Sequence, residues 1–315
     1  MSTAGEPTRL GRRRGAPPGR PGSSPEPAGG RRDAPRGRRG ARASLWAGAA
    51  LLALVVCLAV LAPLLTPYSP RATRIAPALL PPGSPHHLLG TDHLGRDELA
   101  RVLYGGRVSL LVGFAAAVIV TVVGTVIGVT WAFLRGPASH AVSAVVDALL
   151  ALPLLVVVLG FQAVVRPGTA GVVLAIGLTG WMPVARMARA RTSVVRVEPY
   201  VRVARQLGAR RRDTFVHHLL PAVAPAVLSV SMFEVAGAIL TESTLSFLGL
   251  GVPSSQATWG NMLTSSQDDL LGGDWWLVVP PAAGIVLTVA AVSLVIGVRD
   301  SAARRGGESG KGEPR

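Results

Sequence analysis

The feature that most constrains this chain is a run of 22 residues, Ser44 to Leu65, that carries no charged side chain. A helix of about 20 apolar residues is long enough to cross the hydrocarbon core of a bilayer. Five further apolar runs follow, at residues 108–133, 141–165, 168–185, 222–241 and 275–298. A chain that is 49% hydrophobic and 16% charged is also too apolar for an ordinary soluble protein. We therefore predict an all-α membrane protein with six transmembrane helices.

The distribution of arginine predicts which side of the membrane each connection occupies. Residues 1–43 contain 11 of the 32 basic side chains and almost no large apolar ones, which is typical of a disordered tail. Nine arginines lie between Arg186 and Arg212, whereas residues 250–274 contain none. Because basic segments remain in the cytoplasm, we expect both termini there, in a multi-pass protein of the inner or plasma membrane.

These boundaries divide the chain into tails, loops and a core. The expected parts are a disordered basic cytoplasmic tail at 1–43, a first transmembrane helix at 44–66, an extracytoplasmic loop at 67–107, a core of five transmembrane helices at 108–298 and a cytoplasmic tail at 299–315. Within the core, residues 186–220 form a long cytoplasmic loop. The extracytoplasmic loop departs from the charge rule because it contains five arginines, which Asp92, Asp97 and Glu98 offset in part.

Residue usage argues against several classes of function. Lys311 is the only lysine, and its neighbours lack the glycine and hydroxyl of a phosphate-binding loop. No G-x-S-x-G or H-E-x-x-H motif is present, and the spacing of His86, His87 and His93 fits no standard zinc pattern. Aromatic residues are scarce at 5%, so we expect no nucleic-acid partner. We predict a protein that is not an enzyme, with no catalytic residue, metal site or cofactor of its own, and with a packed thiol at Cys57.

The long cytoplasmic loop contains a short amphipathic helix. Positions spaced i, i+3, i+4 and i+7 share one face of a helix and are apolar here: Tyr200, Val203, Ala204 and Leu207. Gly208 is expected to end this helix, since glycine tolerates the left-handed conformation at a C-terminus. A second short helix is predicted from Asp213 to Leu220, before Pro221 opens the next span. The pair is either a surface element lying on anionic lipid or a docking element for a cytoplasmic partner.

Three motifs resemble those of a known transporter family. Residues 200–209, followed by Leu219-Leu220-Pro221, resemble the EAA loop of ABC importer permeases, although Arg202 replaces its glutamate and Val203 its first alanine. Residues 87–97 and 104–110 resemble the external H-P-L-G-T-D-x-x-G-R-D and Y-G-x-R-x-S-L motifs of dipeptide and oligopeptide permeases. Residues 240–263 resemble the L-x-E-A-x-L-S-F-L-G-L-G and W-G-x-M-L motifs of the C-type subunit in the same group.

The resemblance implies a fold, partners and site residues. The fold would be that of a type I ABC importer permease, also called MetI-like. The chain would form a heterodimer with a second homologous permease, receive solute from an extracytoplasmic binding protein and be driven by two ATP-binding subunits that hold ATP and Mg. The solute would be a dipeptide, an oligopeptide or a related small solute such as nickel. The implied coupling residues are Tyr200, Val203, Ala204, Leu207, Gly208, Ala209 and Pro221, and the implied extracytoplasmic motif is Gly90, Thr91, Asp92, Gly95, Arg96 and Asp97.

Acidic residues inside the spans offer candidates for the translocation path. Asp147, Glu234 and Glu242 are costly in a bilayer, so each must face protein or water. For Asp147 the family resemblance favours a structural role over a solute-binding one, and Glu234 could equally make a hydrogen bond between helices. The alternative function, an ion-coupled secondary transporter, would require such residues to bind the coupling ion. Gly124 and Gly128 lie four residues apart and predict close packing of two helices.

Overall fold

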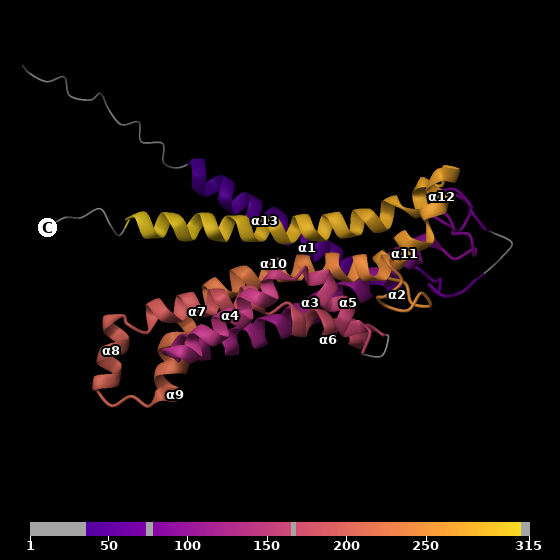
Figure 1. Ribbon diagram of the computed structural model, residues 1–315. Coiled ribbons are helices and arrows are strands. Elements are labelled where there is room, and N and C mark those ends of the chain that lie inside the picture. Colours follow the sequence, from indigo (N-terminus) through magenta and orange to yellow (C-terminus); the bar gives the residue numbers. More distant parts are fainter. Residues whose placement is uncertain (1–35, 74–77, 165–167, 310–315) are drawn as a thin grey trace, which may run out of the picture.

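The computed structural model describes residues 36–73, 78–164 and 168–309; this part of the chain consists of helices and connecting loops, and its β-structure is limited to two isolated bridges (Figure 1). Five stretches are long and apolar enough to cross a membrane, or six if one bent pair of helices counts as a single span. These stretches are formed mostly by the helices α1 (Arg36–Val60), α3 (Glu98–Phe133), α4 (Pro137–Ala151), α5 (Leu154–Gln162), α6 (Thr169–Thr179), α7 (Met182–Val195), α10 (Leu220–Phe247) and α13 (Val279–Ser309).

Shorter helices lie near the two ends of the bundle. Those at one end are α8 (Pro199–Gln206), α9 (Arg211–Thr214) and the π-helix η1 (Phe215–Leu219); those at the other are α2 (Ala62–Leu65), α11 (Trp259–Ser265), α12 (Gln267–Gly272) and the 3-10 helix η2 (Trp275–Leu277) (Figure 1). The predicted second helix of the cytoplasmic loop is therefore a turn of α-helix followed by a π-helix. Pro221 has no N–H to donate to the carbonyl of His217, which favours this wider turn.

Several helices are longer than the sequence predicted. Residues 36–43 belong to α1, so the prediction of disorder is wrong for them; residues 1–35 lie outside the described part. Helix α3 begins at Glu98 rather than at residue 108, because the carboxylate of Asp97 accepts a hydrogen bond from the backbone N–H of Ala100. Helix α7 continues to Val195, and α13 continues past residue 298 to Ser309.

The third predicted span is broken. Helices α4 and α5 meet at an angle of 90°. Leu152 is extended, with ψ of 136°, and Pro153 follows it at the break. A residue before proline is driven out of the helical region by the pyrrolidine ring, which explains why α4 stops there. The sequence analysis treated residues 141–165 as one continuous helix and missed this bend.

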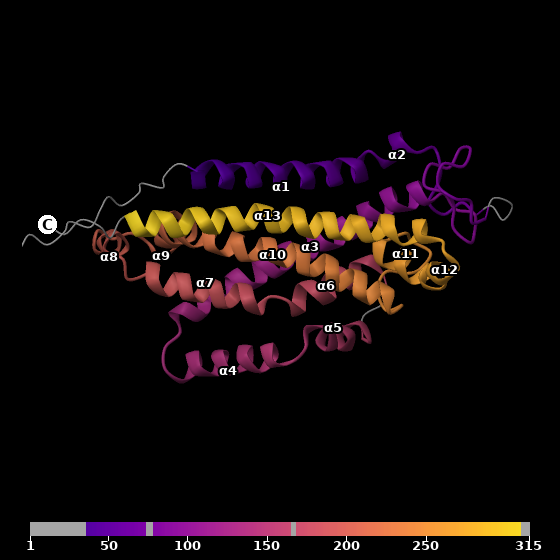
Figure 2. The ribbon, with the colours of Figure 1, turned by 90° about the horizontal axis from the view of Figure 1, so that it is seen from above.

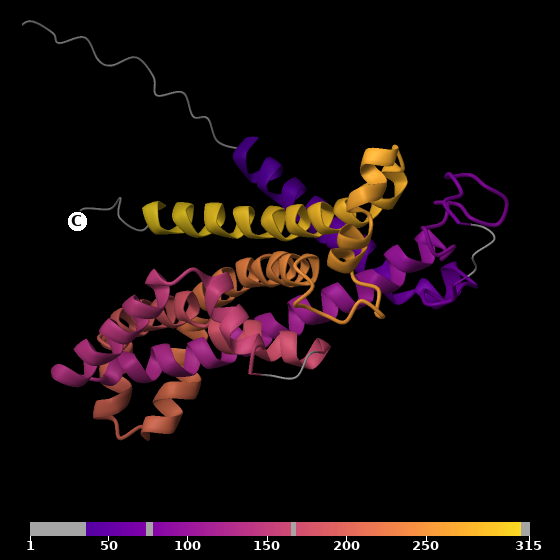
Figure 3. The same cartoon turned by 45° about the vertical axis from the view of Figure 1, so that its right-hand side comes forward.

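Helix α3 is the central element of the bundle. It packs against α7, α10, α6 and α1, and α1 also lies along α13. Figures 2 and 3 show α1 and α13 together on one side of α3, while Figure 2 shows the α4–α5 pair at the opposite edge. A Cβ at Gly124 would lie 2.7 Å from the carbonyl oxygen of Trp181, and one at Gly128 would lie 2.2 Å from that of Ala185. The predicted close helix packing at these two glycines is confirmed.

Candidate functional site

The extracytoplasmic motif folds into a compact polar structure, residues 78–101, that we call the cap. Asp92 is 1% exposed and lies at its centre. One carboxylate oxygen accepts hydrogen bonds from the backbone N–H groups of Leu94 and Arg96, both at 2.9 Å. The other accepts from Arg96 Nε at 2.6 Å and from the guanidinium of Arg101. A single buried carboxylate therefore organises the turn and forms ion pairs with two arginines.

Electrostatics explains why the cap tolerates its arginines. Burial alone would raise the pKa of Asp92, but the nearby charge of Arg101 and the hydrogen bonds and charge of Arg96 hold that pKa below its ordinary value. Arg96 and Arg101 are thus both paired with Asp92, which confirms the predicted charge offset for this one of the three acidic residues. Asp97 contacts His87 instead, and burial raises the pKa of Glu98 to about 8. Sequence analysis did not single out Arg101, although its position one turn after an N-capping aspartate was visible.

A second pair fixes the start of α3. His87 Nδ1 lies 2.8 Å from Asp97 Oδ2, and both side chains are buried. The Nδ1 atom of His87 therefore has its partner inside the cap. Gly90 has φ of +79°, and a Cβ there would lie 2.2 Å from the carbonyl oxygen of Leu80, so only glycine fits. All six predicted motif residues, Gly90, Thr91, Asp92, Gly95, Arg96 and Asp97, therefore belong to one folded unit.

Glu242, a predicted translocation-path residue, lies in the protein interior. Its side chain is 0% exposed and accepts hydrogen bonds from Ser109 of α3 at 3.1 Å and from Ser246 at 2.8 Å. The hydroxyl oxygen of Ser109 in turn accepts from the backbone N–H of Trp259, at 3.2 Å. The carboxylate therefore connects α3, α10 and the start of α11. Its partner serines were not identified from the sequence.

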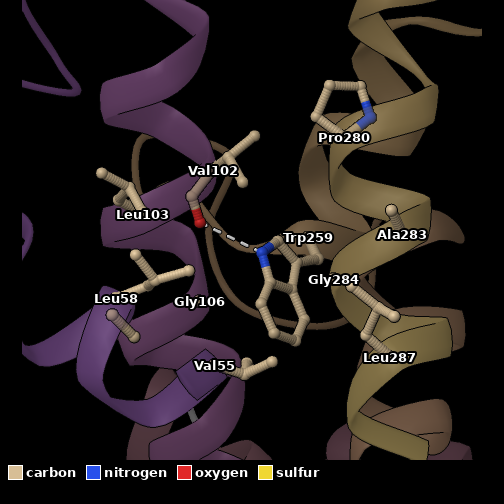
Figure 4. A pocket seen from close by; sticks show the side chains of 11 residues that line it. Val55, Leu58, Val102, Leu103, Gly106, Trp259, Pro280, Ala283, Gly284 and Leu287 are labelled. Carbon is tan, nitrogen blue, oxygen red and sulfur yellow. Dashed lines mark hydrogen bonds between the residues drawn. The ribbon is translucent and has the colours of Figure 1, made fainter. Parts of the chain in front are cut away.

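Trp259 closes an apolar groove between α1, α3 and α13 (Figure 4). Its indole Nε1 donates to the backbone carbonyl of Val102 at 3.1 Å. A Cβ at Gly106 would lie 2.9 Å from the indole ring, and one at Gly284 would lie 2.6 Å from it, so two glycines make room for the tryptophan. The other lining residues are apolar: Val55, Leu58, Ala59, Val102, Leu103, Pro280, Ala283 and Leu287. Such a groove offers no charged group to a polar solute.

At the opposite end of the bundle, α8 ends in the way that the sequence predicted. Gly208 has φ of +85°. The N–H of Ala209 donates to the carbonyl of Ala204 at 3.1 Å, which is the bond of a Schellman C-cap. Pro221 lies in the first turn of α10. The glycine corner and the helix that follows it therefore form one continuous path from α8 to the long helix α10.

The apolar face predicted for α8 is largely exposed. The exposed fractions are 48% for Tyr200, 51% for Val203 and 82% for Leu207. Val201, which the sequence analysis did not list, is instead fully buried against a cluster that includes Val195, Leu219 and Val223. Helix α8 is thus anchored to the bundle by Val201 and leaves its predicted face uncovered within the chain.

The two remaining acidic candidates occupy different surroundings. Asp147 on α4 forms an ion pair with Arg186 on α7, and these side chains are 49% and 53% exposed. Ser143 donates a hydrogen bond to Asp147 at 3.3 Å. Glu234 is partly buried on α10, where its carboxylate would lie 4.0 Å from a Cβ on Gly180. Asp147, Glu234 and Glu242 therefore have separate neighbours, and Arg186 is a partner that sequence spacing could not reveal.

Comparison with known proteins adds a family to this geometry. Residues 124–304, more than half of the chain, match the family described as binding-protein-dependent transport system inner membrane component. A solved structure titled as an amino acid ABC transporter with histidines is 18% identical, covers 63% of this chain and 92% of its own, and has a TM-score of 0.46.

Curated relatives extend the similarity beyond that region. A Brucella suis biovar 1 protein, provisionally named a peptide transport system permease, is 38% identical over 82% of this chain and 87% of its own length. The oligopeptide transport system permease protein OppC of Bacillus subtilis is 34% identical over 68% of this chain and 70% of its own. The dipeptide transport system permease protein DppC of the same organism is 34% identical over 69% and 67%, respectively.

Proposed function

This chain belongs to the family of binding-protein-dependent transport system inner membrane components and is the permease of an ABC importer, and on that premise we propose that it carries dipeptides or oligopeptides into the cell. The observation that carries the choice of peptides is the 38% identity over 82% of the chain to a peptide permease. The same relatives lend no support to an ion-coupled secondary transporter.

The family works with an ATPase and a substrate-binding protein. In our proposal this chain pairs with one homologous permease as a heterodimer, and two ATP-binding subunits supply the energy. ATP and Mg would therefore be held by those partner subunits. The extracytoplasmic binding protein would approach the end of the bundle that contains the cap, and the ATP-binding subunits the end that contains α8.

The α8 end suits contact with an ATP-binding subunit. Val203 and Leu207 present apolar surface that the chain itself does not cover, which fits helix-in-groove recognition. The C-cap at Gly208 leads through α9 and η1 directly into α10, so movement of α8 would be passed on to a long helix. Tyr200, Ala204, Ala209 and Pro221 complete this coupling segment.

Orientation is a separate part of the proposal, with both termini and α8 in the cytoplasm. It can be tested in a Cys57→Ala background, because Cys57 is exposed on α1 and the expectation of a packed thiol is wrong. Single cysteines at Ser254 and Val197, which are both exposed, would be treated with a membrane-impermeant thiol reagent in intact cells. We expect labelling of Ser254→Cys alone; labelling of Val197→Cys would reverse the orientation.

The transport function is tested by reconstituting this chain with its partner permease, ATP-binding subunits and binding protein in liposomes. We expect uptake of trialanine that requires ATP and the binding protein and that persists when an uncoupler is added at fixed ATP. Uptake that an uncoupler abolishes would favour ion coupling. A complex that hydrolyses ATP but takes up no peptide would contradict peptide import.

A further inference from the structure

The ion pair between Asp147 and Arg186 is more exposed than the contacts made by the acidic side chains of Glu242, Asp92 and Asp97. Glu242 is fully buried, and so are Asp92 and Asp97 in the cap. Asp147 and Arg186 are instead about half exposed on facing helices. Asp147 is the eleventh residue of α4, which places it about 15 Å from the start of that helix and inside the third predicted span.

The backbone beside this pair is also irregular. Asp147 lies about one turn before the 90° break between α4 and α5. Leu152 and Pro153 are exposed at the break, as are Leu154 and Leu155 at the start of α5. A helix break leaves terminal N–H and C=O groups without partners inside the helix. At membrane depth such a backbone is tolerated only when it is buried in protein or lines a water-filled cavity.

Both features lie on the α4–α5 pair, which forms one edge of the bundle (Figure 2). Helix α4 is attached to the rest through a small apolar cluster of Trp131, Val146 and Met182 and through the polar contacts of Ser139. Two charged side chains and a helix break would be costly against lipid. Water in a solute path beside the α4–α5 pair would solvate the two charged side chains and the backbone groups at the helix break.

We propose that Asp147 and Arg186 line the translocation path and exchange their mutual contact for the charged ends of a passing peptide. Arg186 binds the terminal carboxylate, since a guanidinium matches the geometry of a carboxylate. Asp147 binds the terminal ammonium. The pair neutralises itself when no solute is present and offers one charge of each sign when a zwitterion arrives. This assignment rests on the proposed peptide import.

Water access is the first test. In the complete complex with Cys57→Ala, Ala144→Cys places a thiol one turn before Asp147, at an exposed position. Leu54→Cys, on α1 and 54% exposed, is the matched control for a surface that faces lipid. We expect a hydrophilic thiol reagent to modify Ala144→Cys and not Leu54→Cys. We also expect delivered trialanine, but not trialanine blocked at both ends, to slow the modification.

Charge is the second test. The double variant Asp147→Asn with Arg186→Gln removes both charges and leaves no unpaired one, so it should still fold. Loss of charge-assisted contacts should lower trialanine uptake about tenfold or more, mainly through a raised KM. Ser143→Ala removes a hydrogen bond to Asp147 without removing charge and should transport like the unmodified chain.

The outcomes separate this inference from the importer function. If the unmodified complex takes up trialanine but Ala144→Cys is as unreactive as Leu54→Cys, water does not reach the pair and the path assignment is wrong. Wild-type uptake by the neutral double variant would likewise overturn it, leaving only a structural link between α4 and α7. Absence of trialanine uptake by the unmodified complex would instead count against the proposed peptide import.

Discussion

The two ends of this permease differ in which side chains they bury and which they expose. In the cap, charged side chains are buried and Asp92 is paired with two arginines: Asp92 is 1% exposed and Arg101 is 4% exposed. In α8, apolar side chains are left outside, with Leu207 at 82% exposure. The central carboxylate of the cap therefore finds its partners within the chain, whereas the surface of α8 is of the kind that another protein completes. Substitutions in the cap should act on stability, and substitutions on α8 should act on coupling.

The largest expected effect is loss of the central carboxylate of the cap. Asp92→Ala removes the carboxylate that accepts hydrogen bonds from Arg96 and from the buried guanidinium of Arg101, and breaking a buried pair in this way costs about 3–5 kcal/mol. Thermal unfolding of the purified chain in detergent measures the loss. Arg71→Gln, at an exposed position before the cap, should change stability little. An equal loss in the two variants would show that the cap network does not stabilise the chain.

The next effect compares two glycines with the same backbone conformation. Gly208 has φ of +85° and Gly83 has φ of +83°, and a Cβ at either would meet nothing within 4 Å. Valine at each position should cost on the order of 1–2 kcal/mol of local strain. Only Gly208→Val should also separate ATP hydrolysis from uptake in the reconstituted complex. Normal coupling in Gly208→Val would remove the argument that this corner transmits movement.

A smaller pair of effects separates the two faces of α8. Leu207→Asp adds a charge to the exposed face and should weaken binding of the ATP-binding subunit while the unfolding temperature is unchanged. Val201→Ala removes a fully buried side chain and should destabilise the chain by about 1–3 kcal/mol. Pull-down of the ATP-binding subunit and thermal unfolding, measured on both variants, should give opposite patterns.

The smallest effect is the acid response of the cap. Because the pKa of Asp92 is lower in the folded chain, its ionised form stabilises the fold at every pH above the unfolded value, which is about 3.9. This contribution disappears as pH falls below that value and through the folded one. The difference in stability between the unmodified chain and Asp92→Asn should thus shrink below about pH 4. Above that pH it also includes the titration of the neighbouring Glu98, since burial, with a further contribution from the charge of Asp92, raises the pKa of Glu98 to about 8. A difference that is already lost at pH 6 would contradict the assignment.

The accuracy of the sequence predictions follows the range of the interactions involved. Hydropathy located the apolar segments because a span needs only a local run of apolar residues. Gly208 was predicted to be left-handed because a C-cap depends on a few neighbouring positions. The start of α3 was misplaced by ten residues because polar residues before 108 hid a helix whose N-cap is Asp97. The break at Pro153 was missed because length and apolarity alone favoured a continuous span.

The site residues, too, were identified where a local motif marks them, whereas their partners from distant parts of the chain were not. The six motif positions of the cap were identified, but their meaning depends on Arg101 and His87 folding back onto two aspartates. Glu242 was identified as a candidate for the path, but its hydrogen-bond partner Ser109 lies 133 residues earlier and could not be inferred from the sequence. Asp147 and Arg186 are 39 residues apart, and only the packing of α4 against α7 joins them.

The sequence by itself determined the membrane character of this protein, its family resemblance, its helix-ending glycine and the absence of a phosphate-binding loop around its only lysine. Each of these depends on residues that are neighbours along the chain. The tertiary structure alone decided which charged groups are buried and paired and which remain exposed at the broken helix. The physical reason is that the energy of a charge depends on the partners and water around it, and those are set when distant helices pack.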